Sequence, residues 1–179
     1  MYQALILSST YLRKAMTDKS PVPLIEKGQI IPAFTLPGAD GMPHSPWDYK
    51  QREHLLLLFP SSGTTTEGRG FLRAFAQDYT RFRDEQCATL AITPDTVLTN
   101  LETQEALHLP YDLLADPTGK VITRYTTWDT DTHTVTPTLV LADRYGALYE
   151  RWSGEQEAEL PTIASLLDTL AYLNRLCTP

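Results

Sequence analysis

A short, wholly apolar run limits what this chain can fold into more than any other feature. Residues 55–59 read Leu-Leu-Leu-Leu-Phe and are followed by Pro60. The run is far shorter than the roughly 20 apolar residues that span a bilayer, so it predicts a strand with both faces buried. A strand of that kind lies in the middle of a parallel sheet that helices cover on both sides. The run therefore points to an α/β domain.

The rest of the chain supplies the other elements of such a domain. Aromatic residues three and four positions apart, from Phe71 to Phe82, predict a helix over 64–84 directly after the strand. The further predicted elements are a strand over 87–93, a helix over 96–107, a short extended piece over 111–114, a helical turn or two over 121–125, a hairpin joining 138–142 to 147–151, and a last helix from about Pro161. We therefore predict an α/β fold with a mixed central sheet and helices on both faces.

The first residues of the chain predict an extension that precedes this domain. Apolar residues recur at near-helical spacing up to Met16, and Pro21 and Pro23 end any helix there. We divide the chain into an N-terminal extension over 1–23 and one domain over 24–179, because no low-complexity linker interrupts the sequence. The extension is expected to dock on the domain or on a partner.

Composition and charge argue against several classes of function. The formal net charge is −7 and the pI is near 5.0, without a cluster of basic residues, so no nucleic-acid partner is expected. No apolar run is long enough for a membrane span, and the start lacks the basic segment of a signal peptide, so we expect a cytoplasmic protein. The two cysteines form no C-x-x-C pair and the four histidines are isolated, so neither a metal nor a cofactor is expected.

Several motifs occur in the order in which one known family has them. They are GQIIPAFTLP at 28–37 with Asp40-Gly41, the strand that ends in Phe59-Pro60, LLADP at 113–117 with Gly119-Lys120, and LVLADRYG at 139–146. Over roughly residues 24–175 the chain resembles the AhpC/TSA (peroxiredoxin) family. This resemblance implies a thioredoxin-like fold.

The resemblance also implies a site, and the chain departs from the family at two of its positions. The family motif P-x-x-x-T-x-x-C, whose cysteine attacks peroxide, matches at Pro60 and Thr64 but ends in Glu67. The arginine that the family places shortly before its late strand is replaced by Thr136, which precedes Pro137 in a segment similar to the cis-proline segment of thioredoxin. These five positions are the candidate site, and none of them is assigned a catalytic role.

The replacement of the cysteine changes what the site can do. A peroxidase of this family needs a thiolate, because the thiolate attacks the peroxide and is oxidised to a sulfenic acid. The start of a helix also favours the carboxylate of Glu67, which has no such oxidation state. Our leading hypothesis is a redox-inactive domain that binds a protein partner or a small ligand, as a docking module or in a homo-oligomer. The alternatives are a thiol oxidoreductase that uses Cys87 or Cys177, and acid–base catalysis by Glu67. An activating cation could still reach the site from Arg124 or Arg144.

Some of these residues have a structural interpretation beside the functional one. Thr64-x-x-Glu67 before an apolar-periodic run is typical of a capping box, and otherwise the two residues belong to a ligand pocket. Cys87 opens a buried strand and is expected to pack as a small hydrophobic residue. Trp128 either packs against its own loop or contributes to binding.

Overall fold

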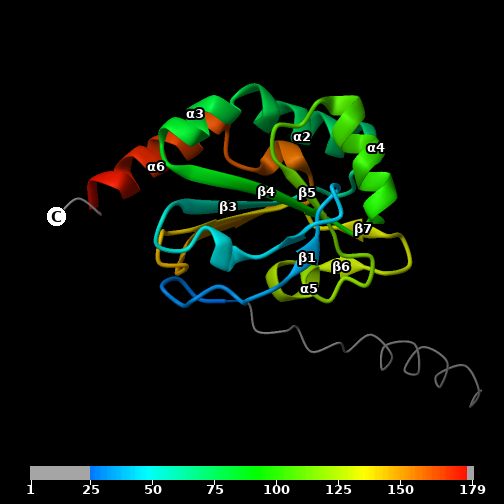
Figure 1. Cartoon of the computed structure of the whole chain (residues 1–179), viewed down its shortest axis with the longest axis horizontal. Helices are drawn as coiled ribbons and strands as arrows, with labels where there is room; N and C mark the ends of the chain where they lie inside the picture. Colours follow the sequence, from blue (N-terminus) through cyan, green and yellow to red (C-terminus); the bar gives the residue numbers. More distant parts are fainter. Residues whose placement is uncertain (1–24, 177–179) are drawn as a thin grey trace, which may run out of the picture.

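The centre of the molecule is a five-stranded sheet. A computed structural model describes residues 25–176, so the predicted extension over 1–23 and Cys177 lie outside the described residues. The strand order is β5-β4-β3-β8-β9 (Figure 1). The strands are β3 (His54–Phe59), β4 (Cys87–Thr93), β5 (Asp112–Ala115), β8 (Thr138–Ala142) and β9 (Leu148–Ser153). β3, β4 and β5 are parallel, whereas β8 is antiparallel to β3 and to β9. The predicted mixed sheet is confirmed.

The two faces of the sheet are covered unequally (Figure 1). One face carries the longer helices, which are α2 (Thr66–Gln77), α3 (Tyr79–Asp84), α4 (Val97–Leu107) and α6 (Ile163–Leu176). The other carries α5 (Ile122–Tyr125), the 3-10 turn η1 (Pro46–Asp48), and the short hairpins β1–β2 (Leu36–Pro37, Pro43–His44) and β6–β7 (Trp128–Asp129, Thr134–Val135). The α/β fold with helices on both faces is confirmed. Within residues 25–176, no helix combines the length and apolarity that crossing a membrane requires.

β3 lies at the centre of the sheet because both of its faces are apolar. Leu56 and Leu58 are buried in the cluster that α2, α3 and α6 share, and Leu55, Leu57 and Phe59 are buried in the cluster on the α5 side. Full burial of one such side chain contributes about 1.5–3 kcal/mol. The central strand therefore fixes where Pro60 and the segment after it emerge from the sheet.

The predicted helix over 64–84 is in fact two helices. α2 ends at Gln77, and Asp78 has φ −102° and ψ 9°. The N–H groups of Arg81 and Phe82 then donate to the Asp78 carbonyl at 3.0 and 3.3 Å, which starts α3. Aspartate competes with helical backbone for hydrogen bonds, and the Asp78 carboxylate accepts one from Arg81 Nη1 at 2.8 Å. The apolar period continues across this break, so the sequence pattern does not reveal it.

Candidate functional site

The segment between β3 and α2 holds three of the five candidate positions. Pro60 follows the end of β3 and is buried, whereas Thr64 and Glu67 are exposed. α2 begins at Thr66 and its N-cap is Thr65, whose Oγ1 accepts a hydrogen bond from the Gly68 N–H at 3.2 Å. The predicted capping box of Thr64 and Glu67 is therefore wrong. The N-cap lies one residue later than predicted. Thr64, Thr65 and Thr66 have the same side chain, so the sequence alone does not show which of them caps the helix.

Glu67 is the second residue of α2. The backbone N–H groups of the first helical turn have no partner within the helix, so this end carries partial positive charge that favours a carboxylate. The next residue, Gly68, lies so close to the preceding loop that a Cβ there would be 1.8 Å from the Ser62 carbonyl oxygen. The start of α2 therefore packs closely against the loop that precedes it, whereas the side chain of Glu67 is exposed.

Ser61 joins this loop to two distant parts of the chain. Its carbonyl accepts a hydrogen bond from the Val135 N–H at 3.0 Å. Its own N–H donates to Glu157 Oε1 at 3.0 Å, and its hydroxyl donates to the same oxygen. Gly63 N–H donates to Asp95 Oδ2 at 3.1 Å. The loop, the segment before β8 and the turn η2 (Glu157–Glu159) therefore meet at one end of the sheet.

Thr136 and Pro137, the other two candidate positions, lie in the segment that Ser61 contacts. The Thr136 carbonyl accepts hydrogen bonds from the hydroxyls of Thr126 and Thr138, at 2.9 and 3.0 Å. Pro137 is buried, and its carbonyl accepts from the Gly154 N–H at 3.1 Å. A network of hydroxyl groups thus occupies the region where the family resemblance implies an arginine. No peptide bond within residues 25–176 is cis, so the likeness of Pro137 to the cis-proline of thioredoxin does not hold.

The two arginines that the sequence left as possible cations are bound elsewhere. Arg124 Nη1 donates to the Ala33 carbonyl at 3.1 Å. Arg144 Nη2 donates to Asn174 Oδ1 at 3.3 Å, near the end of α6. Neither hydrogen bond connects to the loop before α2, and neither arginine supplies it with charge at short range.

An open depression adjoins the first turn of α2. It is lined by Glu67 together with Gln156, Glu157 and Ala158. Sequence reasoning missed Ser61 and Glu157, because they lie 96 positions apart and no motif joins them. The acidic run that begins at Glu155 was the one available signal. With carboxylates on two sides, the depression suits a cationic or hydrogen-bond-donating group.

Cys87 lies at the other end of the same sheet. It pairs with His54 at the start of β3, whereas Pro60 follows the end of that strand. Six strand residues at about 3.3 Å each separate the two ends by roughly 20 Å. Cys87 is fully buried, its Sγ donates to the Ala88 carbonyl at 3.5 Å, and burial raises the pKa of its thiol far above the usual range. The prediction that Cys87 packs as a small hydrophobic residue is confirmed.

Trp128 packs against its own loop, as the structural interpretation predicted. Its ring stacks on His133 with centroids 6.0 Å apart. A Cβ at Gly119, which has φ +64°, would be 1.6 Å from the indole. Among residues 25–176, no group of three or more His, Cys, Asp or Glu side chains is arranged to hold a metal ion.

Comparison with known proteins agrees with this geometry. Two curated relatives are a protein named Peroxiredoxin bcp1 from Schizosaccharomyces pombe, 29% identical over 115 residues, and a Putative peroxiredoxin bcp from Coxiella burnetii, 31% identical over 104 residues. These matches cover 62% and 56% of this chain. They cover 57% and 66% of the relatives, so the chain spans less than two thirds of the length of the curated proteins that it matches.

Solved structures show the same fold at lower identity. The peroxidoxin BcpB of Mycobacterium tuberculosis superposes with a TM-score of 0.73 at 19% identity, covering 86% of this chain and 99% of that one. A reduced 2-Cys peroxiredoxin of Plasmodium vivax gives 0.75 at 16% identity, covering 85% and 98%. Residues 27–151, more than half of the chain, match the AhpC/TSA family. The fold, the relatives and this match together place the chain in the AhpC/TSA family.

Proposed function

We propose that this chain is an AhpC/TSA domain in which Glu67 stands in the place of the peroxide-attacking cysteine, and that the domain acts by binding. One observation carries the proposal. The exposed side chain in the first turn of α2, in register with Pro60 and Thr64, is a carboxylate. The thiol that the structure describes, Cys87, is buried at the opposite end of the sheet.

The chemistry of Glu67 supports a function other than peroxide reduction. Peroxidase activity in this family passes a pair of electrons from a sulfur to the O–O bond and leaves a sulfenic acid. A carboxylate keeps the negative charge that the helix start favours, but it has no corresponding oxidised state. Thr136, which replaces the arginine of the family motif, supplies no positive charge from that position to polarise a peroxide oxygen.

The charge of the depression suggests the chemistry of its partner. Glu67 and Glu157 line it, and Glu155 and Glu159 belong to the same acidic run. A lysine or arginine side chain of a protein partner would complement these carboxylates, and Ala158 is the one apolar residue among the four that line the depression. We therefore propose a protein partner that presents a basic segment, with a second copy of this chain as one form that such a partner can take.

Nuclear magnetic resonance titration tests the binding function. Uniformly labelled protein is titrated with a lysine-rich octapeptide and with a glutamate-rich octapeptide of the same length. We expect the lysine-rich peptide to shift the amide resonances of the first turn of α2 and of η2, and Glu67→Gln to weaken that effect. Glu102→Gln, on the exposed side of α4, is the matched control and should bind like the natural chain. Equal shifts in both glutamine variants, or none with either peptide, would contradict the proposed partner.

A further inference from the structure

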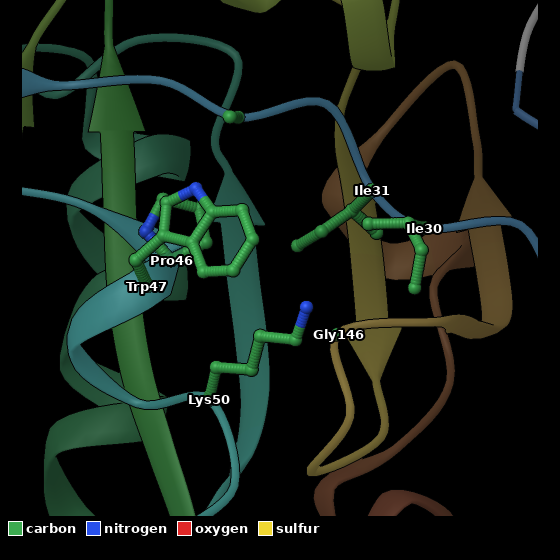
Figure 2. Close-up of a pocket in the computed structure, with 7 residues that line it drawn as sticks. Ile30, Ile31, Pro46, Trp47, Lys50 and Gly146 are labelled. Carbon is green, nitrogen blue, oxygen red and sulfur yellow. The ribbon is translucent and has the colours of Figure 1, made fainter.

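A small apolar pocket lies on the α5 side of the sheet, away from the candidate site. It forms between the segment before β1, the turn η1 and the turn of the β8–β9 hairpin, and its lining includes Ile30, Ile31, Trp47, Lys50 and Gly146 (Figure 2). Ile31 is buried, whereas Ile30 and Trp47 are 56% and 59% exposed. The cavity measures about 20 Å³, which is room for the tip of one side chain.

Lys50 gives this pocket a charge. Its Nζ lies 4.1 Å from the centroid of the Trp47 ring, and Figure 2 shows it between that ring and the two isoleucines. Among residues 25–176, no carboxylate lies within ion-pair distance of this ammonium. The nearby Asp48 uses its carboxylate to accept from the Ser45 N–H at 2.8 Å. The pocket therefore suits an apolar side chain that has a carboxylate close to it in sequence.

The N-terminal segment of this chain has one acidic residue with a long apolar side chain close to it in sequence. Asp18 is the single acidic residue before residue 25, and Met16 precedes it by two positions. Methionine is long and flexible, so its thioether tip fits small irregular cavities. Arg13, Lys14 and Lys19 make the segment basic overall, whereas the whole chain has a net charge of −7, so the segment and the domain attract each other.

The segment also has the reach that this contact needs. Six residues lie between Asp18 and Ile25, and the seven steps from one Cα atom to the next span up to about 25 Å when the chain is extended. The described chain then runs beside the same hairpin that borders the pocket. Gly28 N–H donates to the Leu148 carbonyl at 2.8 Å, and Ile31 N–H donates to the Gly146 carbonyl at 2.9 Å.

We propose that residues 16–18 dock on the domain of their own chain, with the Met16 side chain in the pocket and the Asp18 carboxylate on the Lys50 ammonium. The contact covers Trp47 and Ile30, and it holds the N-terminal segment on the α5 side of the sheet. This inference is independent of the proposed function, because neither Glu67 nor the depression takes part in it.

The test follows the indole N–H resonance of Trp47 in the full chain, assigned with Trp47→Phe. We expect Met16→Ala and Asp18→Asn each to shift this resonance, while Ser20→Ala leaves it in place. In a Lys50→Met background Asp18→Asn should lose its effect, because the ammonium that the carboxylate contacts has been removed. The indole resonance of Trp128 serves as the internal control for an intact fold.

Two results would overturn the proposal. An unchanged Trp47 resonance in both Met16→Ala and Asp18→Asn shows that this segment does not cover the pocket. Shifts that fade on dilution of the protein show that the segment of a second copy occupies it, so the contact within one chain is wrong. Shifts that persist on dilution and disappear in the Lys50→Met background support it.

Discussion

At the scale of single residues, the first turn of α2 determines which chemistry the candidate site can carry out. Glu67 places a carboxylate where the helix dipole favours an anion, and Gly68 allows the helix start to lie against the Ser62 carbonyl. The identity of Glu67 could be read from the sequence through the family motif. The close approach at Gly68 could not, because a glycine in sequence does not reveal what its missing side chain would meet.

Replacing Glu67 with cysteine should create a reactive thiol without an efficient peroxidase. In Glu67→Cys the sulfur sits in the first turn of α2, so its pKa should fall below the roughly 8.5 of a free cysteine. Oxidation should remain slow, because the loss of one preorganised donor costs about a hundredfold or more in rate and Thr136 supplies no cation. An iodoacetamide pH profile gives the pKa, and stopped-flow oxidation by hydrogen peroxide gives the rate. Oxidation at the speed of a working peroxiredoxin would show that the cation is not needed here.

Gly68→Ala should destabilise the fold, because the new Cβ would lie 1.8 Å from the Ser62 carbonyl oxygen. We expect a loss of about 1–3 kcal/mol in the free energy of unfolding. Gly70→Ala is the matched control on the same helix, since its Cβ meets nothing within 4 Å. Alanine is the better helix former, so Gly70→Ala should add about 0.5–1 kcal/mol. Urea unfolding of both variants measures the difference, and equal effects would argue against the close packing of the helix start.

At the scale of elements, sequence periodicity located most helices and strands to within a residue or two but did not resolve their ends. The predicted strand over 87–93 and the helix over 96–107 agree with β4 and α4. The break at Asp78 and the N-cap at Thr65 were missed. Ends depend on which of several neighbouring polar side chains bonds the backbone, and an apolar pattern carries no information about that choice.

Thr65→Ala should lower the stability of the protein more than Glu67→Ala does. Thr65 Oγ1 accepts from the Gly68 N–H, and the loss of such a cap costs about 0.5–2 kcal/mol. Glu67 makes no capping bond, so its replacement removes only the interaction of an exposed carboxylate with the helix dipole, about 0.3–1 kcal/mol, which the helix preference of alanine partly offsets. Thermal or urea unfolding distinguishes the two. A larger loss of stability in Glu67→Ala than in Thr65→Ala would contradict this and support the capping box that the sequence predicted.

At the scale of the whole molecule, the sheet was predictable and the assembly of the site was not. Contiguous apolar runs identify central strands directly, since each side chain must be buried on one face or the other. Ser61 forms hydrogen bonds with Val135 and Glu157, which lie far from it in the sequence. No sequence pattern predicts which distant residues such a single polar residue will contact. The pocket beside Trp47 was missed for the same reason.

Stability should fall as the pH drops through the range below neutrality, and His54 should account for part of the loss. Burial lowers the pKa of His54, and the Arg144 guanidinium acts in the same direction, against the hydrogen bond to Asn174. The unfolded chain therefore takes up this proton near the usual pKa of about 6.5, and the folded chain does so only at lower pH. Between these two values the unfolded state binds more protons, so the free energy of unfolding decreases as the pH falls.

Urea unfolding at pH 7.5 and 5.5 measures this dependence. His54→Gln should show a smaller decrease than the natural chain, because the titrating group is gone and an amide can still bond Asn174. His108→Asn is the control, since His108 is exposed with φ +52° and asparagine tolerates that backbone. Equal decreases in the natural chain and in His54→Gln would contradict the role of His54.

A domain that acts by binding alone should show no reaction of its thiols with peroxide, and one measurement tests that directly. The full natural chain is reduced, mixed with hydrogen peroxide and a thiol reductant, and peroxide consumption is followed while sulfenic acid is trapped with a cyclic diketone for mass spectrometry. We predict no consumption above that of the reductant alone and no trapped sulfenic acid at either cysteine. Rapid consumption that disappears in Cys87→Ser or Cys177→Ser, with the trap on the same residue, would contradict the proposal and make this chain a peroxidase.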